Sequence, residues 1–116
     1  MPYENLLVEI GKGRVGGITL NRPDDLNTFS TPMAAELLDA LVKMDADPDV
    51  RVVLIKGAGK AFCAGIDVKE LPDKTAMQYR EWIERMERPL VAVSRMRKPV
   101  IVQFPRNVMG TPDPLT

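Results

Sequence analysis

The stretch KAFCAGIDVKEL, residues 60–71, decides the fold of this 116-residue chain. It follows a β-branched, apolar run at residues 52–56, which predicts a buried strand, and it leads into a helical turn expected over residues 66–71. The small residues Ala64 and Gly65 would let a ligand approach the backbone closely. The N–H groups that follow them have no partner inside the turn and can bind negative charge. The segment is therefore a candidate for half of an oxyanion hole, although a tight connector that needs small residues for packing explains the same pattern.

The elements expected around this stretch alternate between strand and helix. Ser30 is a candidate N-cap, and Pro32 suits the first turn of the helix that follows. Pro89 should kink or split a second helix, because proline cannot donate the backbone hydrogen bond of a helix interior. The strands are expected at residues 6–10, 17–21, 52–56 and 100–103, and the helices at about 31–45 and about 75–98. This order predicts an α/β fold with right-handed crossovers.

The composition excludes several classes of function. The chain has no histidine, so it holds neither a Ser-His-Asp triad nor a histidine-ligated metal site. Lys+Arg and Asp+Glu both number 16, and this balance offers no broad basic field for nucleic acid or an anionic membrane. No apolar run approaches the length of a membrane span. The first residues lack the features of a signal peptide, and a single cysteine allows no internal disulfide, so we expect a cytoplasmic location.

Three short motifs match known ligand-binding loops only in part. GKGRVG at residues 11–16 has the glycine spacing of a dinucleotide-binding turn, but a strand should follow it, so we predict a hairpin turn. DADPD at residues 45–49 begins like a calcium loop but lacks its later glycine and glutamate, so we predict a solvated helix end. GAGK at residues 57–60 lacks the spacing of a Walker A loop.

The charged and reactive side chains of the second helix and of the central stretch have structural explanations. Glu81, Glu84 and Glu87 recur at every third position with arginines between them, which favours a salt-bridged outer face. Trp82 on the same helix is expected in the core. Cys63, with no histidine in the chain to activate it, is expected to be a small buried hydrophobe.

Four segments together resemble the crotonase superfamily, the enoyl-CoA hydratase/isomerase type. ITLNRP at 18–23 with LN at 26–27 resembles the family's first strand and loop, and DVRVVLIKG at 49–57 resembles its next strand. AFCAGIDVKEL at 61–71 resembles its most specific N-terminal motif, and RKPVI at 97–101 resembles a later strand. The resemblance predicts a partial crotonase-like domain over residues 1–103 and a disordered, non-family tail over residues 104–116.

The resemblance implies the N-terminal part of a ββα superhelix (ClpP/crotonase-like) that binds acyl-CoA thioesters. Two backbone N–H groups of such proteins stabilise an enolate or a thioester oxyanion, and coenzyme A enters as part of the substrate, with no other cofactor. Carried over to this chain, the first donor is the N–H of Ile66. The implied substrate-binding and CoA-binding residues are Leu26, Ala64, Gly65, Ile66, Asp67, Val68 and Lys69. Asp24 and Asp25 stand where the family often has a cation for a CoA phosphate.

The sequence departs from the family pattern after residue 101. Residues 102–108 replace the Gly-rich segment that carries the second oxyanion donor, and the family's catalytic carboxylates would follow later still. We therefore expect an enoyl-CoA hydratase/isomerase-like protein that acts on or binds acyl-CoA, with a truncated, inactive CoA-binding or interaction module as the alternative. Full-length members would form trimer-based homo-oligomers. In this chain, core residues such as Val53, Ile55, Leu90 and Val100 should be less buried than their apolar character demands, and the chain should self-associate.

Overall fold

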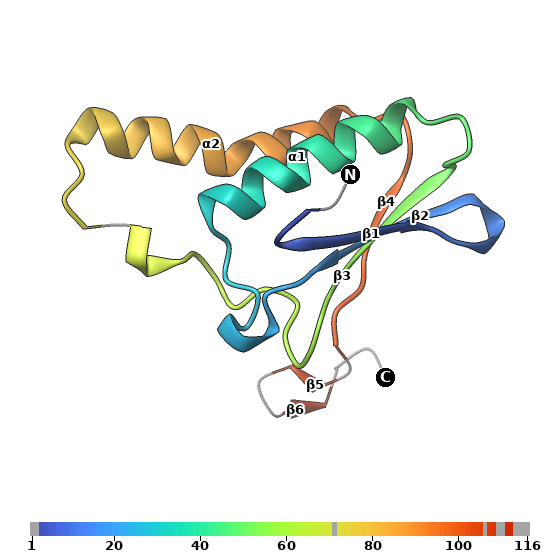
Figure 1. Ribbon diagram of the computed structural model, residues 1–116, viewed down its shortest axis with the longest axis horizontal. Coiled ribbons are helices and arrows are strands. Elements are labelled where there is room, and N and C mark those ends of the chain that lie inside the picture. Colours follow the sequence, from blue (N-terminus) through green and yellow to red (C-terminus); the bar gives the residue numbers. More distant parts are fainter. Residues whose placement is uncertain (1–2, 71, 106, 109–110, 113–116) are drawn as a thin grey trace.

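The computed structural model describes residues 3–70, 72–105, 107–108 and 111–112, and its centre is a four-stranded sheet (Figure 1). The strands lie in the order β1 (Leu6–Ile10), β2 (Val15–Leu20), β3 (Val52–Gly57) and β4 (Val100–Val102). β1 pairs antiparallel with β2, whereas β2, β3 and β4 are parallel to one another. The α/β prediction is therefore confirmed.

Two helices supply the connections between the parallel strands. α1 (Thr31–Ala46) connects β2 to β3, and α2 (Ala76–Arg95) connects β3 to β4. Figure 1 shows the two helices side by side on the same side of the sheet. Among the described residues, no helix combines the length and the apolar character that crossing a membrane requires.

The Gly-rich segment between β1 and β2 is a hairpin turn, as the sequence predicts. Gly11 N–H donates to the Val15 carbonyl at 2.8 Å around a short 3-10 helix, η1 (Lys12–Arg14). β2 follows directly and pairs Leu20 with Leu6. Because a strand and not a helix follows the glycines, no helix N-terminus is available there for a pyrophosphate.

α1 begins and ends at capped termini. Ser30 Oγ accepts a hydrogen bond from the Met33 N–H at 3.3 Å, as expected of an N-cap. At the other end, Lys98 Nζ donates to the carbonyl oxygens of Met44, at 2.6 Å, and Asp47. A cation at a helix C-terminus satisfies carbonyls that have no partner within the helix. The residue two positions before β4 thus closes the end of α1.

α2 is a single helix, which excludes the predicted split at Pro89, whereas the kink predicted as the alternative stays a prediction. It begins with a capping box in which Thr75 and Gln78 exchange hydrogen bonds, and it then runs through Pro89 without dividing. The prolyl side chain is almost fully buried. The predicted salt-bridged face is wrong, because no ion pair within 4.0 Å forms between residues of α2 in the described part of the chain.

The core lies between α1 and one face of the sheet, and it corrects part of the burial prediction. Val53 and Ile55 are buried, at 0% and 5% exposure, because α1 covers the face of β3 from which they project. Val100 is half-buried at the margin of this core, whereas Leu90 is 67% exposed, as predicted. The buried members of the main cluster are Leu6, Ile18, Leu20, Met33, Leu37, Ala40, Leu41, Met44, Val50, Val53 and Ile55.

The segment beyond residue 103 is described only in part. β5 (Asn107–Val108) pairs antiparallel with β6 (Thr111–Pro112). The remaining residues of the expected tail, from 106 onward, lie outside the described residues. The boundary at residue 103 and the disorder of 104–116 therefore stay predictions.

Asn27 joins the loops that follow β2 and β3. Its side chain is fully buried. Oδ1 accepts from the Arg22 N–H at 2.7 Å, and Nδ2 donates to the carbonyls of Ala58 and Ala61, each at 2.8 Å. Gly57 permits this approach, because a Cβ there would lie 2.4 Å from the Ala61 carbonyl oxygen. The oxygen and the nitrogen of the Asn27 side chain therefore bond to different loops. Asn27 and Ala58, which these bonds bring together, are 31 residues apart in sequence.

Replacing Asn27 should cost far more stability than replacing a neighbouring asparagine. Asn27→Ala removes three hydrogen bonds and leaves buried backbone groups unpaired, so we expect the free energy of unfolding to fall by about 3 kcal/mol. Urea unfolding measures this change. Asn21→Ala is the matched control, because the Asn21 side chain makes no hydrogen bond to the described residues, and it should cost less than about 1 kcal/mol. Equal losses for the two variants would contradict the role of Asn27.

Candidate functional site

The segment after β3 lies beside the segment that leads into α1, and this pairing forms the candidate site. The Ala64 N–H donates to the Leu26 carbonyl at 3.0 Å, and the Phe29 N–H donates to the Gly65 carbonyl at 2.7 Å. The Asp67 N–H donates in turn to the Phe29 carbonyl at 2.9 Å. Phe29 and Ile66 thereby form an isolated parallel bridge.

The backbone N–H of Ile66 is directed away from Phe29, although Ile66 is the bridge partner of that residue. Residues 65 and 67 make the hydrogen bonds to Phe29, and successive residues of an extended segment direct their N–H groups to opposite edges. The N–H of Ile66 therefore points to the open edge, and it donates no hydrogen bond to any described residue. An unpaired N–H held on an otherwise bonded segment is a fixed donor for an incoming oxygen.

Gly65 gives this edge its shape. Its φ of +133° lies where side-chain-bearing residues are strained. A Cβ at this position would meet nothing within 4 Å, so the space beside the backbone is open. Ala64 is also exposed. The two small residues therefore leave the approach to the Ile66 N–H clear.

On one side of Ile66 lies an apolar cavity of about 540 Å³. The loop contributes Phe62, Cys63 and Ile66 to its wall, α2 contributes Trp82 and Met86, and the sheet side includes Ile55. Glu87 is the only charged residue among the described residues that line it. The cavity therefore suits a hydrocarbon group.

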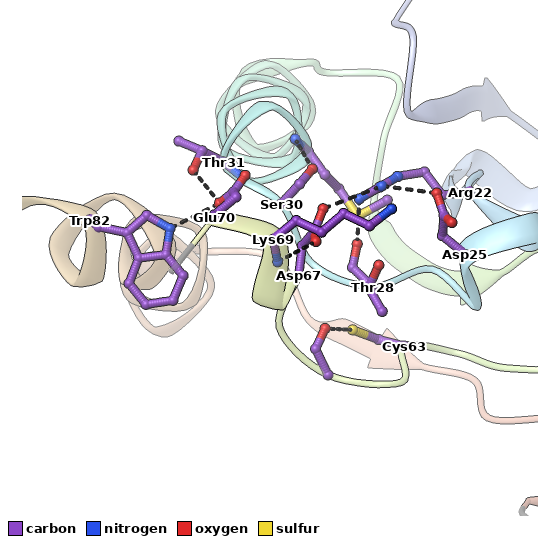
Figure 2. A network of polar contacts seen from close by, with 12 residues as sticks. Arg22, Asp25, Thr28, Ser30, Thr31, Cys63, Asp67, Lys69, Glu70 and Trp82 are labelled. Atoms are coloured by element: carbon purple, nitrogen blue, oxygen red, sulfur yellow. Dashed lines mark hydrogen bonds and ion pairs between the residues drawn. The ribbon is translucent and has the colours of Figure 1, made fainter. Parts of the chain in front are cut away.

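On the other side of Ile66 lies a small polar hollow of about 170 Å³. Figure 2 shows the Arg22 guanidinium in this region, where it donates to the Thr28 carbonyl at 2.9 Å and pairs with Asp25 at 3.0 Å and Asp67 at 3.5 Å. Asp67 also accepts from the Lys69 N–H at 3.1 Å. The Asp67 carboxylate therefore has partners and acts in shaping the loop.

Of the remaining predicted site residues, Lys69 lines the polar hollow, while Leu26 and Val68 lie on the two loops beside it in sequence, next to the short helix η2 (Pro23–Asp25) and in η3 (Val68–Glu70). Leu26 is 44% exposed and has a left-handed φ of 54° just after η2. Val68 begins η3, and Lys69 extends into solvent beside the polar hollow. Cys63 is half-buried, and its Sγ donates to the Gly65 carbonyl at 3.6 Å.

Glu70 is a residue that the sequence interpretation missed. Its carboxylate accepts from the Thr31 N–H at 2.7 Å, from Thr31 Oγ1 at 2.7 Å and from Trp82 Nε1 at 2.9 Å (Figure 2). Burial acts to raise the pKa of Glu70, but the hydrogen bonds from Trp82 and Thr31 outweigh it and hold the pKa below its usual range. No local pattern links Thr31 to Glu70, which are 39 residues apart.

Comparison with known proteins identifies the family. The model of the enoyl-CoA hydratase/isomerase family matches residues 15–111. The chain belongs to this family. The enoyl-CoA hydratase/isomerase resemblance of the four sequence segments is thereby confirmed.

Individual relatives support the same assignment over part of their length. A probable enoyl-CoA hydratase of Mycobacterium bovis is 47% identical over 75 residues, which are 65% of this chain and 29% of that protein. The 1,2-epoxyphenylacetyl-CoA isomerase of Escherichia coli is 38% identical over 102 residues, 84% of this chain and 38% of that protein. This member of the enoyl-CoA hydratase/isomerase family thus spans less than half the length of these relatives.

Solved structures of the family have the same fold. An enoyl-CoA hydratase/isomerase from Xanthobacter autotrophicus matches with a TM-score of 0.84 at 28% identity, over 91% of this chain and 40% of that one. A Legionella pneumophila chain described as a crotonase matches with a TM-score of 0.82 at 29% identity, over 87% and 40%. The crotonase-like fold is therefore confirmed, with the sheet and helices of this chain corresponding to about two fifths of it.

Acidification should weaken the protein through Glu70. A carboxylate whose pKa is lowered by folding stabilises the folded state above the unfolded pKa, about 4.3 for glutamate, and loses this contribution as pH falls through the lower folded value. The difference in free energy of unfolding between the wild type and Glu70→Gln should therefore be constant from pH 7 to about pH 5 and shrink below about pH 4.

Urea unfolding at a series of pH values tests this dependence. The control Glu84→Gln removes an exposed carboxylate that accepts no hydrogen bond from the described residues. It separates the effect of the Glu70 contacts from a general change in charge. A Glu70→Gln difference that stays constant down to pH 3 would show that these hydrogen bonds do not stabilise the folded state.

Proposed function

We propose that this chain binds an acyl-CoA thioester and polarises its carbonyl through the N–H of Ile66. The observation that carries the proposal is the N–H of Ile66, which donates to none of the described residues and belongs to a residue that lines the apolar cavity. A donor fixed in this way stabilises developing negative charge without having to reorganise. The acyl group would occupy the cavity, and the thioester oxygen would accept from Ile66.

The CoA moiety of the bound ligand would extend from the site along Ala64 and Leu26. The hydrogen bond between the Ala64 N–H and the Leu26 carbonyl holds these two residues together at an exposed edge. Lys69 would supply the nearby cation, because it lines the polar hollow and forms no ion pair with the described residues. Asp24 and Asp25 leave no cation on η2 for a phosphate. Coenzyme A enters this proposal as part of the substrate, with no separate cofactor.

The names of the relatives support a CoA thioester as the ligand better than they support one particular reaction. Their names include a hydratase and an epoxyphenylacetyl-CoA isomerase, which share a CoA thioester and differ in the bonds that change. One oxyanion donor is worth about 3 kcal/mol of barrier. We therefore propose that the described residues bind a thioester and polarise its carbonyl. We also propose that the protein is cytoplasmic, where Cys63 would remain a free thiol. A chain that binds CoA without polarising the carbonyl is the second candidate, favoured by the exposed edge at Ala64 and Leu26, which is available to CoA whether or not Ile66 meets a thioester.

Removing the Ile66 N–H should weaken acyl-CoA binding selectively. Ile66→Pro has no N–H, so we expect hexanoyl-CoA to bind about tenfold more weakly, as the loss of one hydrogen bond predicts. Free CoA has no thioester carbonyl, so its binding should change little. Titration calorimetry with both ligands measures the two affinities.

Ile66→Val is the matched control, because it keeps the N–H and a branched side chain and should bind hexanoyl-CoA like the wild type. Thermal unfolding of each variant verifies that it is folded. Equal losses for hexanoyl-CoA and free CoA in Ile66→Pro would favour the second candidate. Absence of hexanoyl-CoA binding to the wild type would reject the proposed function.

We also propose that the chain self-associates through the face of the sheet opposite α1. The strand register places Gly17, Leu54 and Ile101 in one row on this face, and Leu7 lies on it as well. Leu7 is 55% and Ile101 53% exposed. Exposed apolar groups of this kind favour association, because contact removes them from water.

Sedimentation at several concentrations should therefore reveal oligomers of the isolated chain. Ile101→Lys places a charge on the open face and should weaken association about tenfold. Val42→Lys is the control, since Val42 is an exposed apolar residue of α1, away from that face, and it should leave association unchanged. A monomeric wild type with a cooperative, high melting temperature would contradict self-association.

A further inference from the structure

Three donors from two helical segments converge on the carboxylate of Glu70. Thr31, the first residue of α1, contributes its N–H and its hydroxyl, and Trp82, from the second turn of α2, contributes its indole N–H. Glu70 itself ends η3, four positions after Ile66. The side chain therefore joins the loop that carries the unpaired N–H to both helices, as Figure 2 shows.

Only an ionised carboxylate accepts from all three donors. Thr31 N–H lies nearest Oε1, whereas the Thr31 hydroxyl and the indole N–H both bond Oε2. A glutamine in the same place would direct its NH₂ group at one of the N–H donors, whichever way the amide is turned. The arrangement is thus specific for glutamate even though glutamine has the same shape.

The indole is also part of the cavity wall. Trp82 is 8% exposed, and it lines the apolar cavity together with the loop residues Phe62 and Ile66. Its Nε1–H is the polar point of an otherwise apolar side chain, so the hydrogen bond to Glu70 fixes the rotation of the ring. The position of the ring in turn sets the space left for a hydrocarbon group.

We propose that Glu70 is a positioning residue that fixes the Trp82 indole as a wall of the acyl cavity and anchors the Ile66 loop to the start of α1. It touches no reacting atom. Its effect on ligands rests on the proposed function, whereas its effect on the indole does not. Loss of the carboxylate releases the ring and loosens the cavity, so it weakens the binding of the acyl group more than the binding of CoA.

The fluorescence of Trp82 directly tests whether Glu70 positions the indole, because the chain contains a single tryptophan. In Glu70→Gln, the emission maximum should shift to longer wavelength, and acrylamide should quench the fluorescence at least about twofold more efficiently, as expected of an indole freed from a buried hydrogen bond. Glu84→Gln, also a glutamate substitution but on the exposed face of α2, should leave both quantities at the wild-type values. Unchanged emission and quenching in folded Glu70→Gln would overturn the proposal.

Thr31→Val provides a second variant in case Glu70→Gln unfolds. It removes the hydroxyl donor and keeps the backbone donor, so it should shift the emission in the same direction by a smaller amount. Emission identical to the wild type in this variant, together with an unfolded Glu70→Gln, would reduce Glu70 to a general stabilising contact and overturn the positioning role.

Ligand binding tests the effect of Glu70 on the acyl cavity. Glu70→Gln should bind hexanoyl-CoA about tenfold more weakly than the wild type, because binding must then also immobilise the released indole, and should bind free CoA within about twofold of it. Equal affinities for hexanoyl-CoA in the two proteins would overturn the effect on the acyl cavity. If the wild type binds no hexanoyl-CoA, the proposed function fails, and the effect on acyl binding fails with it. The fluorescence comparison still decides whether Glu70 positions Trp82.

Discussion

The buried amide of Asn27 is the contact on which the candidate site depends. Parallel strands bring their carboxyl ends to one edge of a sheet, but the loops that leave those ends have no ladder to hold them. Asn27 provides the missing hydrogen bonds by pairing with Arg22 on its own loop and with Ala58 and Ala61 on the other. The later pairing of Phe29 with Gly65 and Asp67 continues from this junction. Without it, nothing local would align the two segments.

The unpaired donor of the site follows from that alignment. Once Phe29 bonds the residues on both sides of Ile66, the Ile66 N–H must face the other edge. The apolar cavity beside it lowers the local dielectric, which strengthens a hydrogen bond to an oxyanion compared with the same bond in water. The Arg22 and Asp67 side chains pair with each other on the opposite side. The site therefore joins a polar backbone group to an apolar wall, with its nearest acidic charge partnered.

The two helices serve the site as well as the core. α1 covers the sheet and presents Thr31 to the loop, while α2 places its apolar face over the cavity and Trp82 at its margin. Glu70 bonds the Ile66 loop to both helices, and the hydrogen-bond donors around its carboxylate lower its pKa. Stability and site geometry are therefore coupled through one side chain, since the contacts that hold the loop also hold the ring that bounds the cavity.

The sequence by itself determined the features that depend on neighbouring residues. Alternation and β-branching located the strands, Ser30 located the start of α1, and the glycines of residues 11–16 predicted a turn. The motif at residues 61–71 was specific enough to indicate the family, and the small pair Ala64 and Gly65 indicated an open backbone. These signals are local, so they can be read from a linear pattern.

Tertiary structure alone decided which distant groups meet. Thr31 and Trp82 reach Glu70 from positions 39 and 12 residues away, and no periodicity predicts such a meeting. The burial of Val53 and Ile55 likewise depends on how α1 lies across the sheet, and the charged residues of α2 form no ion pair with the described residues despite a spacing that favours such pairs. The physical reason is the same in each case: a hydrogen bond or a buried surface depends on the distance between atoms in space, which sequence spacing fixes only within a single helix turn or strand.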